Sequence, residues 1–516
     1  MKKKVVSMLL VGAMVASLTA CGSSTSSTST SSNNGSETTA EGGEAEVTTN
    51  FANADGTPLQ LVMQFPTFTG APVDTQVVQD AVNEILGEKL GVNITLQIYD
   101  WGSYKQSTTL SLAGGEQIDI LSTILCSYPT LVSQGNLIDM EDEDLIANYG
   151  PDIIAAIGEE YVDACRIDGV LYGVPNNRDF AQGKGCYSIG AEYLDGIGYE
   201  YSDDNIIMAT EEEMIELLGQ LHEAYPDIET FRPATSQLTQ YTTYDFLGSN
   251  DFGVLENYGE KLEVVNLFES EEYINYCKMM KEWNDAGWIS KDAATDTTAV
   301  GTLMANGVLV AYATGGKPGS RAQESSAGKD CVIFQTKKDY ISSSSCSGYP
   351  WAIPITTVNK EAAMAVLNEL YTNPELADLI VYGIKDTHYT ITEDGLLDSS
   401  LSDAYGTLGW LYPNQFNNTV SVGNPSTLWD DIREFNEGSM KSEAVGFSFD
   451  ATSVENEIAA CTNVYNEHLY NLEYGFSSDV DAELAELNTS LYAAGLQTII
   501  DEKQAQLDAW AEAVGK

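Results

Sequence analysis

Aromatic residues in predicted loops are the side chains best suited to hold a ligand. Trp101 directly follows one predicted strand, and Tyr128 follows the next. Trp351 lies in a loop bracketed by prolines, which hold the backbone extended. An aromatic face packs well against the apolar face of a ring-shaped ligand. We therefore predict Trp101, Tyr128 and Trp351 as ligand contacts, with a place in the hydrophobic core as the alternative for Trp351.

Polar side chains that can bind hydroxyl groups gather at two further places. Asn176, Arg178 and Asp179 are crowded where the chain is predicted to cross between two lobes. Asn414 and Gln415 lie in a turn rich in amides and aromatic rings. Because amide, guanidinium and carboxylate groups all hydrogen-bond to hydroxyls, we predict these five residues as ligand contacts. The alternatives are an ion pair of Arg178 with Asp179 across the hinge and a turn-forming role for Asn414.

Signatures of catalysis and of metal binding are missing from the sequence. It has no HExxH, GxSxG or Walker motif, no CxxC and only three histidines. The acidic run at 139–144 lacks the glycine and the closing glutamate of a calcium loop. We therefore predict a protein that is not an enzyme and needs no cofactor or metal. The 77 acidic residues leave a secreted glycosidase open, since only the spatial separation of two carboxylates identifies one.

The charge of the chain excludes nucleic acid as a partner. There are 24 Lys and Arg against 77 Asp and Glu, which gives a formal net charge of −53. Nucleic-acid affinity depends on cations that neutralise phosphates, and this sequence cannot supply a basic groove. The same acidity suggests a cationic or peptide ligand as the alternative to a neutral, hydroxyl-bearing one. Salt would distinguish that ligand, because screening weakens the binding of a cation and hardly affects that of a neutral molecule.

The N-terminus has the pattern of an export signal. Three lysines precede an apolar stretch at 5–20, which ends in LTACG at 18–22. This ending resembles the lipobox of bacterial lipoproteins, in which the cysteine, here Cys21, receives a diacylglycerol and becomes the first mature residue. The alternative is an ordinary signal peptide with a chance cysteine. We predict a signal peptide at 1–20 and a disordered, Ser/Thr-rich tether at 21–56, which is too poor in apolar residues to fold.

Seven cysteines follow Cys21, and an odd number excludes complete pairing within the chain. We expect them to be scattered buried thiols. One or two disulfides are the alternative.

Strands and helices alternate along the rest of the chain. The first part reads as a strand at 59–65, a helix after Asp74, a strand at 92–99, a helix at 104–113 and a strand at 118–121. Further helices are predicted at 210–224, 270–286, 360–370, 374–382 and 479–514. This alternation predicts an α/β fold with mostly parallel sheets, which bind ligands at the carboxyl ends of their strands.

We read two such lobes, each a mostly parallel sheet flanked by helices, with the ligand cleft between them. Lobe 1 is predicted to comprise 57–175 and 347–384, and lobe 2 to comprise 176–346 and 385–516. The crossings fall near 173–179 and 342–348.

The order of several motifs resembles one protein family. After the lipobox come LAGGEQIDI at 112–120, GVLYGVP at 169–175 and ANGVLVA at 305–311, as in the family 1 extracellular solute-binding proteins. KDTHYT at 385–390, GFSFD at 446–450 and EKQAQLDAW at 502–510 resemble a long-chain Gram-positive subgroup. Beside the crossover the chain departs from many of these relatives, with NNRD at 176–179.

This resemblance implies a two-lobed periplasmic-binding-protein-like fold and a function in carbohydrate transport. Such a protein captures a sugar or oligosaccharide and delivers it to the permease of an ABC importer. We expect a monomer on the extracellular face of the cell membrane, attached only through the lipid on Cys21.

Overall fold

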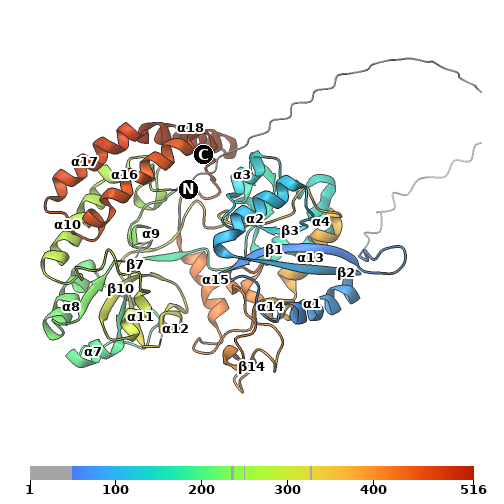
Figure 1. The fold of residues 1–516 in the computed structure, drawn as a ribbon, viewed down its shortest axis with the longest axis horizontal. Coiled ribbons are helices and arrows are strands. Elements are labelled where there is room, and N and C mark those ends of the chain that lie inside the picture. The colour runs from blue at the N-terminus through green and yellow to red at the C-terminus, as the bar shows by residue number, and fades with distance from the viewer. Residues whose placement is uncertain (1–48, 234–236, 249, 326–327) are drawn as a thin grey trace, which may run out of the picture. The chain divides into compact units, whose positions relative to one another are not determined.

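The computed structural model describes residues 49–516, except for 234–236, 249 and 326–327. The predicted signal peptide, Cys21 and most of the predicted tether lie outside the described residues. The described chain forms two lobes, each with its own sheet and hydrophobic core, which Figure 1 shows as two groups of elements.

The first sheet has five strands, in the order β2 (Val92–Asp100), β1 (Leu59–Thr67), β3 (Ile120–Ser122), β13 (Trp351–Ala352) and β6 (Gly173–Val174). β1 pairs in parallel with both β2 and β3, as the alternation of strands and helices predicted. β13 runs antiparallel to both of its neighbours. The start of β13 therefore lies at the same edge of the sheet as the end of β3.

Helices pack around this sheet and fill the first core. They are α1 (Thr75–Leu90), α2 (Trp101–Gly114), α3 (Tyr128–Ser133), α4 (Leu145–Tyr149), α5 (Pro151–Ile157), α6 (Glu159–Asp163), α13 (Lys360–Thr372) and α14 (Pro374–Tyr382). α1 buries Val78, Val82 and Leu86, which share one face at helical spacing. It ends at Gly91, whose left-handed backbone suits glycine.

The second sheet is mixed, with the path β16 (Met440–Lys441), β12 (Asp339–Ile341), β7 (Gln182–Gly190), β10 (Leu309–Gly316) and β9 (Glu229–Arg232). β11 (Cys331–Gln335) also pairs with β7, and β8 (Ile207–Met208) pairs with β11. The long strand β7 is antiparallel to β10, β11 and β12. The prediction of a mostly parallel sheet is thus wrong for this lobe, because apolar runs identify strands but not their direction.

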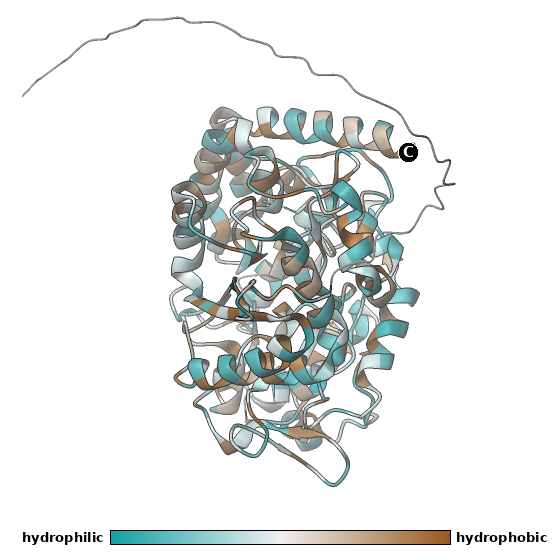
Figure 2. Cartoon of the chain, turned by 90° about the vertical axis from the view of Figure 1, so that its right-hand side faces the viewer, coloured by the Kyte–Doolittle hydropathy of each residue, from teal (hydrophilic) through white to brown (hydrophobic). Residues whose placement is uncertain are grey.

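The second sheet is covered by α7 (Ala191–Ile197), α8 (Glu211–Ala224), α9 (Gln237–Tyr241), α10 (Glu271–Asp285), α11 (Val300–Ala305) and α12 (Ser320–Ser325), with α16 (Glu455–Glu473), α17 (Val480–Ala494) and α18 (Leu496–Val514) beyond α10. The predicted helical finish at 479–514 is α17 and α18, which Gly495 separates. Figure 2 shows hydrophobic and hydrophilic residues alternating along α18, whose buried residues recur every three to four positions.

The segment between α14 and β16 packs differently from its predicted assignment to lobe 2. Tyr405, Leu411 and Tyr412 lie in the first core. The same segment contains β14 (Thr390–Ile391), β15 (Leu397–Asp398) and α15 (Leu428–Gly438). The chain then crosses a third time, because β16 pairs with β12 of the second sheet.

Ordered contacts also begin before the predicted start at Thr57. The backbone N–H of Phe51 donates to the carbonyl of Leu90 (2.8 Å), and its ring lies 6.0 Å from that of Tyr149. Residues 51–56 therefore belong to the folded part rather than to a disordered tether.

All seven cysteines after Cys21 lie in the described part of the chain, and each is a buried free thiol, as expected. Among the described residues, no helix is long and apolar enough to span a membrane.

Candidate functional site

Four aromatic rings form a row at the carboxyl edge of the first sheet, which we call the aromatic row. Phe68 and Trp101 lie 5.2 Å apart between ring centroids, Trp101 and Trp410 6.2 Å, and Trp410 and Tyr349 5.8 Å. Phe68 is 61% exposed, and the other three rings are half-buried. Aromatic rings that are fixed on one side and accessible on the other can stack on a ligand.

The ends of the parallel strands place the first two rings. Phe68 is the residue after β1, and Trp101 is the residue after β2. α2 begins at Trp101 itself, because the side chain of Asp100 caps the helix by accepting from the N–H of Gly102 (3.0 Å). This cap fixes the position of the indole relative to the sheet.

The other two rings come from loops that other parts of the chain hold in place. Tyr349 precedes β13, and the carbonyl next to it, that of Pro350, accepts from the N–H of Thr123 after β3 (3.1 Å). Trp410 lies in a short 3-10 turn at Gly409–Leu411. The side-chain amide of Asn176 donates to the carbonyl of Leu411 in that turn (2.5 Å).

At Tyr349 the aromatic row meets a group of charged side chains. The guanidinium of Arg178 lies over the Tyr349 ring, 4.9 Å from its centroid. Arg178 Nη1 is 3.6 Å from Asp179 Oδ1, and Lys317 Nζ is 2.8 Å from Asp179 Oδ2. Burial opposes ionisation of Asp179, but Lys317 and Arg178 outweigh it and hold the pKa of this carboxyl below its ordinary value. Asp179 is therefore a carboxylate with two cations beside it.

These charges line a cavity of about 480 Å³ at the crossings between the lobes. A volume of this size is within the range of small-molecule sites. Its wall from the second sheet includes Lys317 at the end of β10 and Glu324 on α12. Further hydrogen-bonding side chains line it, namely Gln182, Gln240, Thr314, Gln323, Ser342, Ser344 and Ser345. The cavity thus offers many donors and acceptors next to an aromatic surface, which suits a polyhydroxylated ring.

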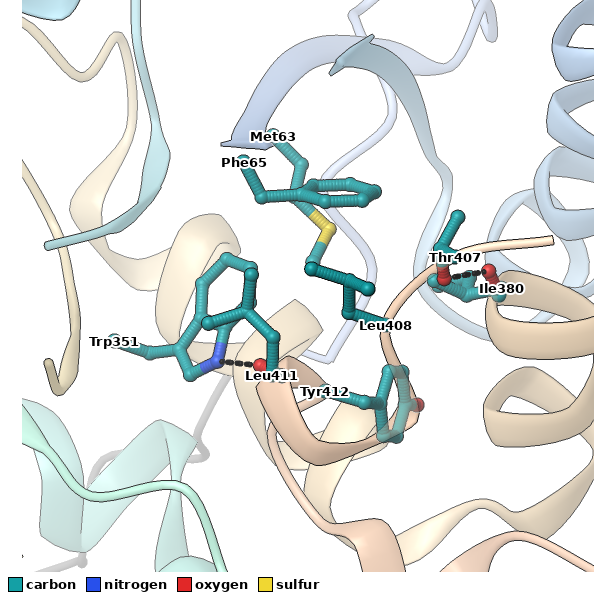
Figure 3. Close-up of a pocket in the computed structure, with 8 residues that line it drawn as sticks. All are labelled: Met63, Phe65, Trp351, Ile380, Thr407, Leu408, Leu411 and Tyr412. Carbon is teal, nitrogen blue, oxygen red and sulfur yellow. Dashed lines mark hydrogen bonds between the residues drawn. The ribbon is translucent and has the colours of Figure 1, made fainter. Parts of the chain in front are cut away.

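Trp351 does not face this cavity. It is 1% exposed, and its indole N–H donates to the carbonyl of Leu411 (2.9 Å), as Figure 3 shows. The space between Trp351 and its neighbours Phe65 and Tyr412 is only about 10 Å³, which is room for one water molecule. The structure corrects the prediction of a ligand contact at Trp351 and places this residue in the core, the stated alternative.

Tyr128 is also a core residue. It is 1% exposed, and its hydroxyl donates to the carbonyl of Cys165 (2.8 Å). Although it follows β3, it lies in the first turn of α3, which directs it into the first core rather than toward the cavity.

The predicted amides hold the loops of the site together. The amide of Asn414 donates to the carbonyl of Tyr371 (2.7 Å), and its oxygen accepts from the N–H of Phe416, so it forms the turn. The backbone N–H of Gln415 donates to the carbonyl of Asn177 (3.0 Å). Together with Asn176, these two residues connect the crossover to the loop that carries Trp410. The role of these amides as ligand contacts stays a prediction.

Of the eight predicted contacts, the structure brings Trp101, Arg178 and Asp179 to the aromatic row and its cavity. Sequence reasoning missed Phe68, Tyr349, Trp410 and Lys317. Phe68 had a usable signal, since it follows the first predicted strand as Trp101 follows the second. Among the described residues, no group of His, Cys, Asp and Glu has the arrangement of a metal site.

Known proteins share parts of this sequence and its architecture. The model of a domain of unknown function, DUF3502, matches residues 443–512. Over 519 residues the chain is 25% identical to a carbohydrate ABC transporter substrate-binding protein of Streptococcus pneumoniae serotype 4, covering 98% of each.

Two crystal structures of the N-glycan transport solute-binding protein NgtS from Streptococcus pneumoniae are also similar. Each alignment covers 88% of this chain and 99% of the NgtS chain. One is described without a glycan and has a TM-score of 0.77 at 22% identity. The other is a complex with Man5GlcNAc and has a TM-score of 0.66 at 22% identity.

Proposed function

We propose that this chain is a family 1 extracellular solute-binding protein, which captures an oligosaccharide and delivers it to the permease of an ABC importer. The observation that carries the proposal is the aromatic row, which leads from the carboxyl edge of the first sheet into a polar cavity of about 480 Å³. Sugars present apolar faces and hydroxyl edges, and this surface is matched to both.

Binding divides between the two lobes. Trp101, Trp410 and Tyr349 of the first lobe stack on sugar rings, while Thr314 and Glu324 of the second lobe bind hydroxyls. A ligand held by both lobes favours their closure, and the permease can then recognise the closed form.

We further propose that the protein is anchored outside the cell through Cys21, which lies outside the described residues. The lipobox-like LTACG at 18–22 and the Ser/Thr-rich stretch that follows support this anchor. Two acyl chains on one sulfur meet the requirement for lasting attachment to a membrane.

A thermal-shift screen against neutral oligosaccharides tests the proposal, with Man5GlcNAc as the first ligand because a similar protein is solved with it. A ligand at 100 times its Kd stabilises the folded protein by about 2.7 kcal/mol, which is readily seen as a higher melting temperature. The shift should persist at high salt. A shift only with cationic peptides, lost as salt rises, would instead identify a charge-driven receptor.

A further inference from the structure

Four charged side chains line the cavity, and their charges cancel. Arg178 and Lys317 are positive, and Asp179 and Glu324 are negative. Asp179 lies between the two cations, with its carboxylate oxygens 3.6 Å from Arg178 Nη1 and 2.8 Å from Lys317 Nζ. The side chains of Arg178 and Asp179 are 16% and 11% exposed, so this pairing is well shielded from solvent.

Both cations also have fixed positions. Arg178 donates to the backbone carbonyl of Asp179 (2.7 Å) and lies over the Tyr349 ring. Lys317 follows β10, and its ammonium donates to Asp179 Oδ2 (2.8 Å), while its backbone N–H donates to the hydroxyl of Ser320 (2.9 Å). Their charged groups are therefore held against Asp179 and are not directed toward an incoming anion.

The second carboxylate, Glu324, belongs to the wall from the second sheet, which also carries Lys317. Glu324 Oε2 accepts from the hydroxyl of Tyr312 (2.6 Å), and Oε1 accepts from that of Thr314 (2.9 Å). These neutral donors stabilise a negative charge without cancelling it. A ligand carboxylate or phosphate that enters the cavity would lose its hydration close to two protein carboxylates. This loss is costly because both cations already contact Asp179 and leave no separate counter-charge for the ligand.

We propose that Asp179 makes this cavity selective for uncharged sugars by neutralising Lys317 and Arg178, so that acidic glycans are rejected. This inference rests on the proposed capture of an oligosaccharide. It adds the chemical class of the ligand and names the residue that sets it.

The test compares Man5GlcNAc with two anionic forms of the same glycan. One is oxidised at the reducing end to the aldonate, and the other carries a 6-phosphate on a terminal mannose, so the charge is sampled at both ends. Calorimetric titration of the wild-type protein should give at least about tenfold weaker binding of both anionic forms, as expected for an uncompensated charge. Equal affinity for the neutral glycan and both anionic forms would overturn the inference.

Asp179→Asn leaves the cavity with one excess positive charge. The affinity for at least one anionic form, relative to that for the neutral glycan, should rise by about tenfold or more, and this gain should shrink with salt. Adding Lys317→Gln restores neutrality and should remove the gain. A folded Asp179→Asn variant with an unchanged ratio would contradict the proposal.

Glu324→Gln provides a second route that leaves the crossover untouched. It also leaves one excess positive charge. The amide oxygen keeps an acceptor for one of the hydroxyls of Tyr312 and Thr314, and the amide NH2 donates to the oxygen of the other. The ratio should therefore shift in the same direction even if Asp179→Asn fails to fold. No shift in this folded variant would count against the proposal. Failure of the wild type to bind Man5GlcNAc or any other neutral oligosaccharide of the thermal-shift screen would overturn the proposed ligand itself, which separates the two failures.

Discussion

At the scale of single residues, two tryptophans of similar appearance have different roles. Trp101 is half-buried in the aromatic row, whereas Trp351 is buried and hydrogen-bonded in the core. An aromatic ring contributes to binding only where one face stays accessible. The two residues should therefore respond differently to truncation.

Trp351→Ala should lower the stability of the protein rather than its affinity. Truncation of a buried tryptophan leaves a cavity, which costs about 3–5 kcal/mol of unfolding free energy. Chemical denaturation should show a clearly lower midpoint, while titration of the remaining folded fraction gives a normal Kd. A variant with an unchanged midpoint and weakened glycan binding would return Trp351 to the site.

The sequence identified Trp101, Arg178 and Asp179 because one general rule covers them: ligands bind at strand ends and at crossings between lobes. It could not separate Tyr349 from Trp351. Which of these aromatics enters the core depends on the pairing of β13 with β3 and β6, both more than 170 residues away in the chain. Trp410 and Lys317 reach the site through tertiary packing, which local patterns do not encode.

At the scale of elements, the predicted β-α-β-α-β start of lobe 1 is confirmed, with α2 beginning at Trp101 rather than near residue 104. The segment that follows the crossover, with glycines at 183 and 185, forms the start of β7. A Cβ at Gly183 would lie only 2.2 Å from the side chain of Gln335 on β11, so a larger residue there would have to displace this side chain. Helix caps and apolar spacing are local signals, whereas the mixed order of the second sheet depends on distant partners.

The packing of α16 on α10 contains a buried acid that should make stability depend on pH. The hydroxyls of Tyr465 (2.5 Å) and Tyr273 (3.2 Å) donate to Oε1 of Glu473. Burial raises the pKa of Glu473 to about 8. In the unfolded chain a glutamate has a pKa of about 4.3, so between these values the native state retains a proton that the unfolded state releases. The stabilisation is complete below the lower pKa and is lost as pH rises through about 8.

Glu473→Gln removes this titration. The denaturation midpoint of the wild type should fall more steeply between about pH 5 and pH 8 than that of the variant. Glu467→Gln, at an exposed position of the same helix, should keep the slope of the wild type. Parallel slopes for the wild type and Glu473→Gln would show that Glu473 ionises normally in the folded protein.

At the scale of the whole molecule, the proposal joins an anchor to a two-lobed receptor. Cys21→Ala should release the protein from the membrane fraction of a lipoprotein-processing host without changing glycan affinity, because residues 21–50 separate the cysteine from the fold. Fractionation after a carbonate wash measures this. Retention of the variant in the membrane fraction would contradict lipid anchoring.

The central claim is that the aromatic row binds the oligosaccharide, and calorimetric titration of the Trp101→Ala/Trp410→Ala double variant tests it most directly. Each lost stacking partner costs about 1 kcal/mol or more, so the Kd for the glycan selected by the thermal-shift screen should rise by about 30-fold or more with a nearly unchanged denaturation midpoint. Trp288→Ala, which truncates a half-buried tryptophan packed against Trp283 of the second lobe, should bind normally. An unchanged Kd in the folded double variant would contradict the assignment of the site.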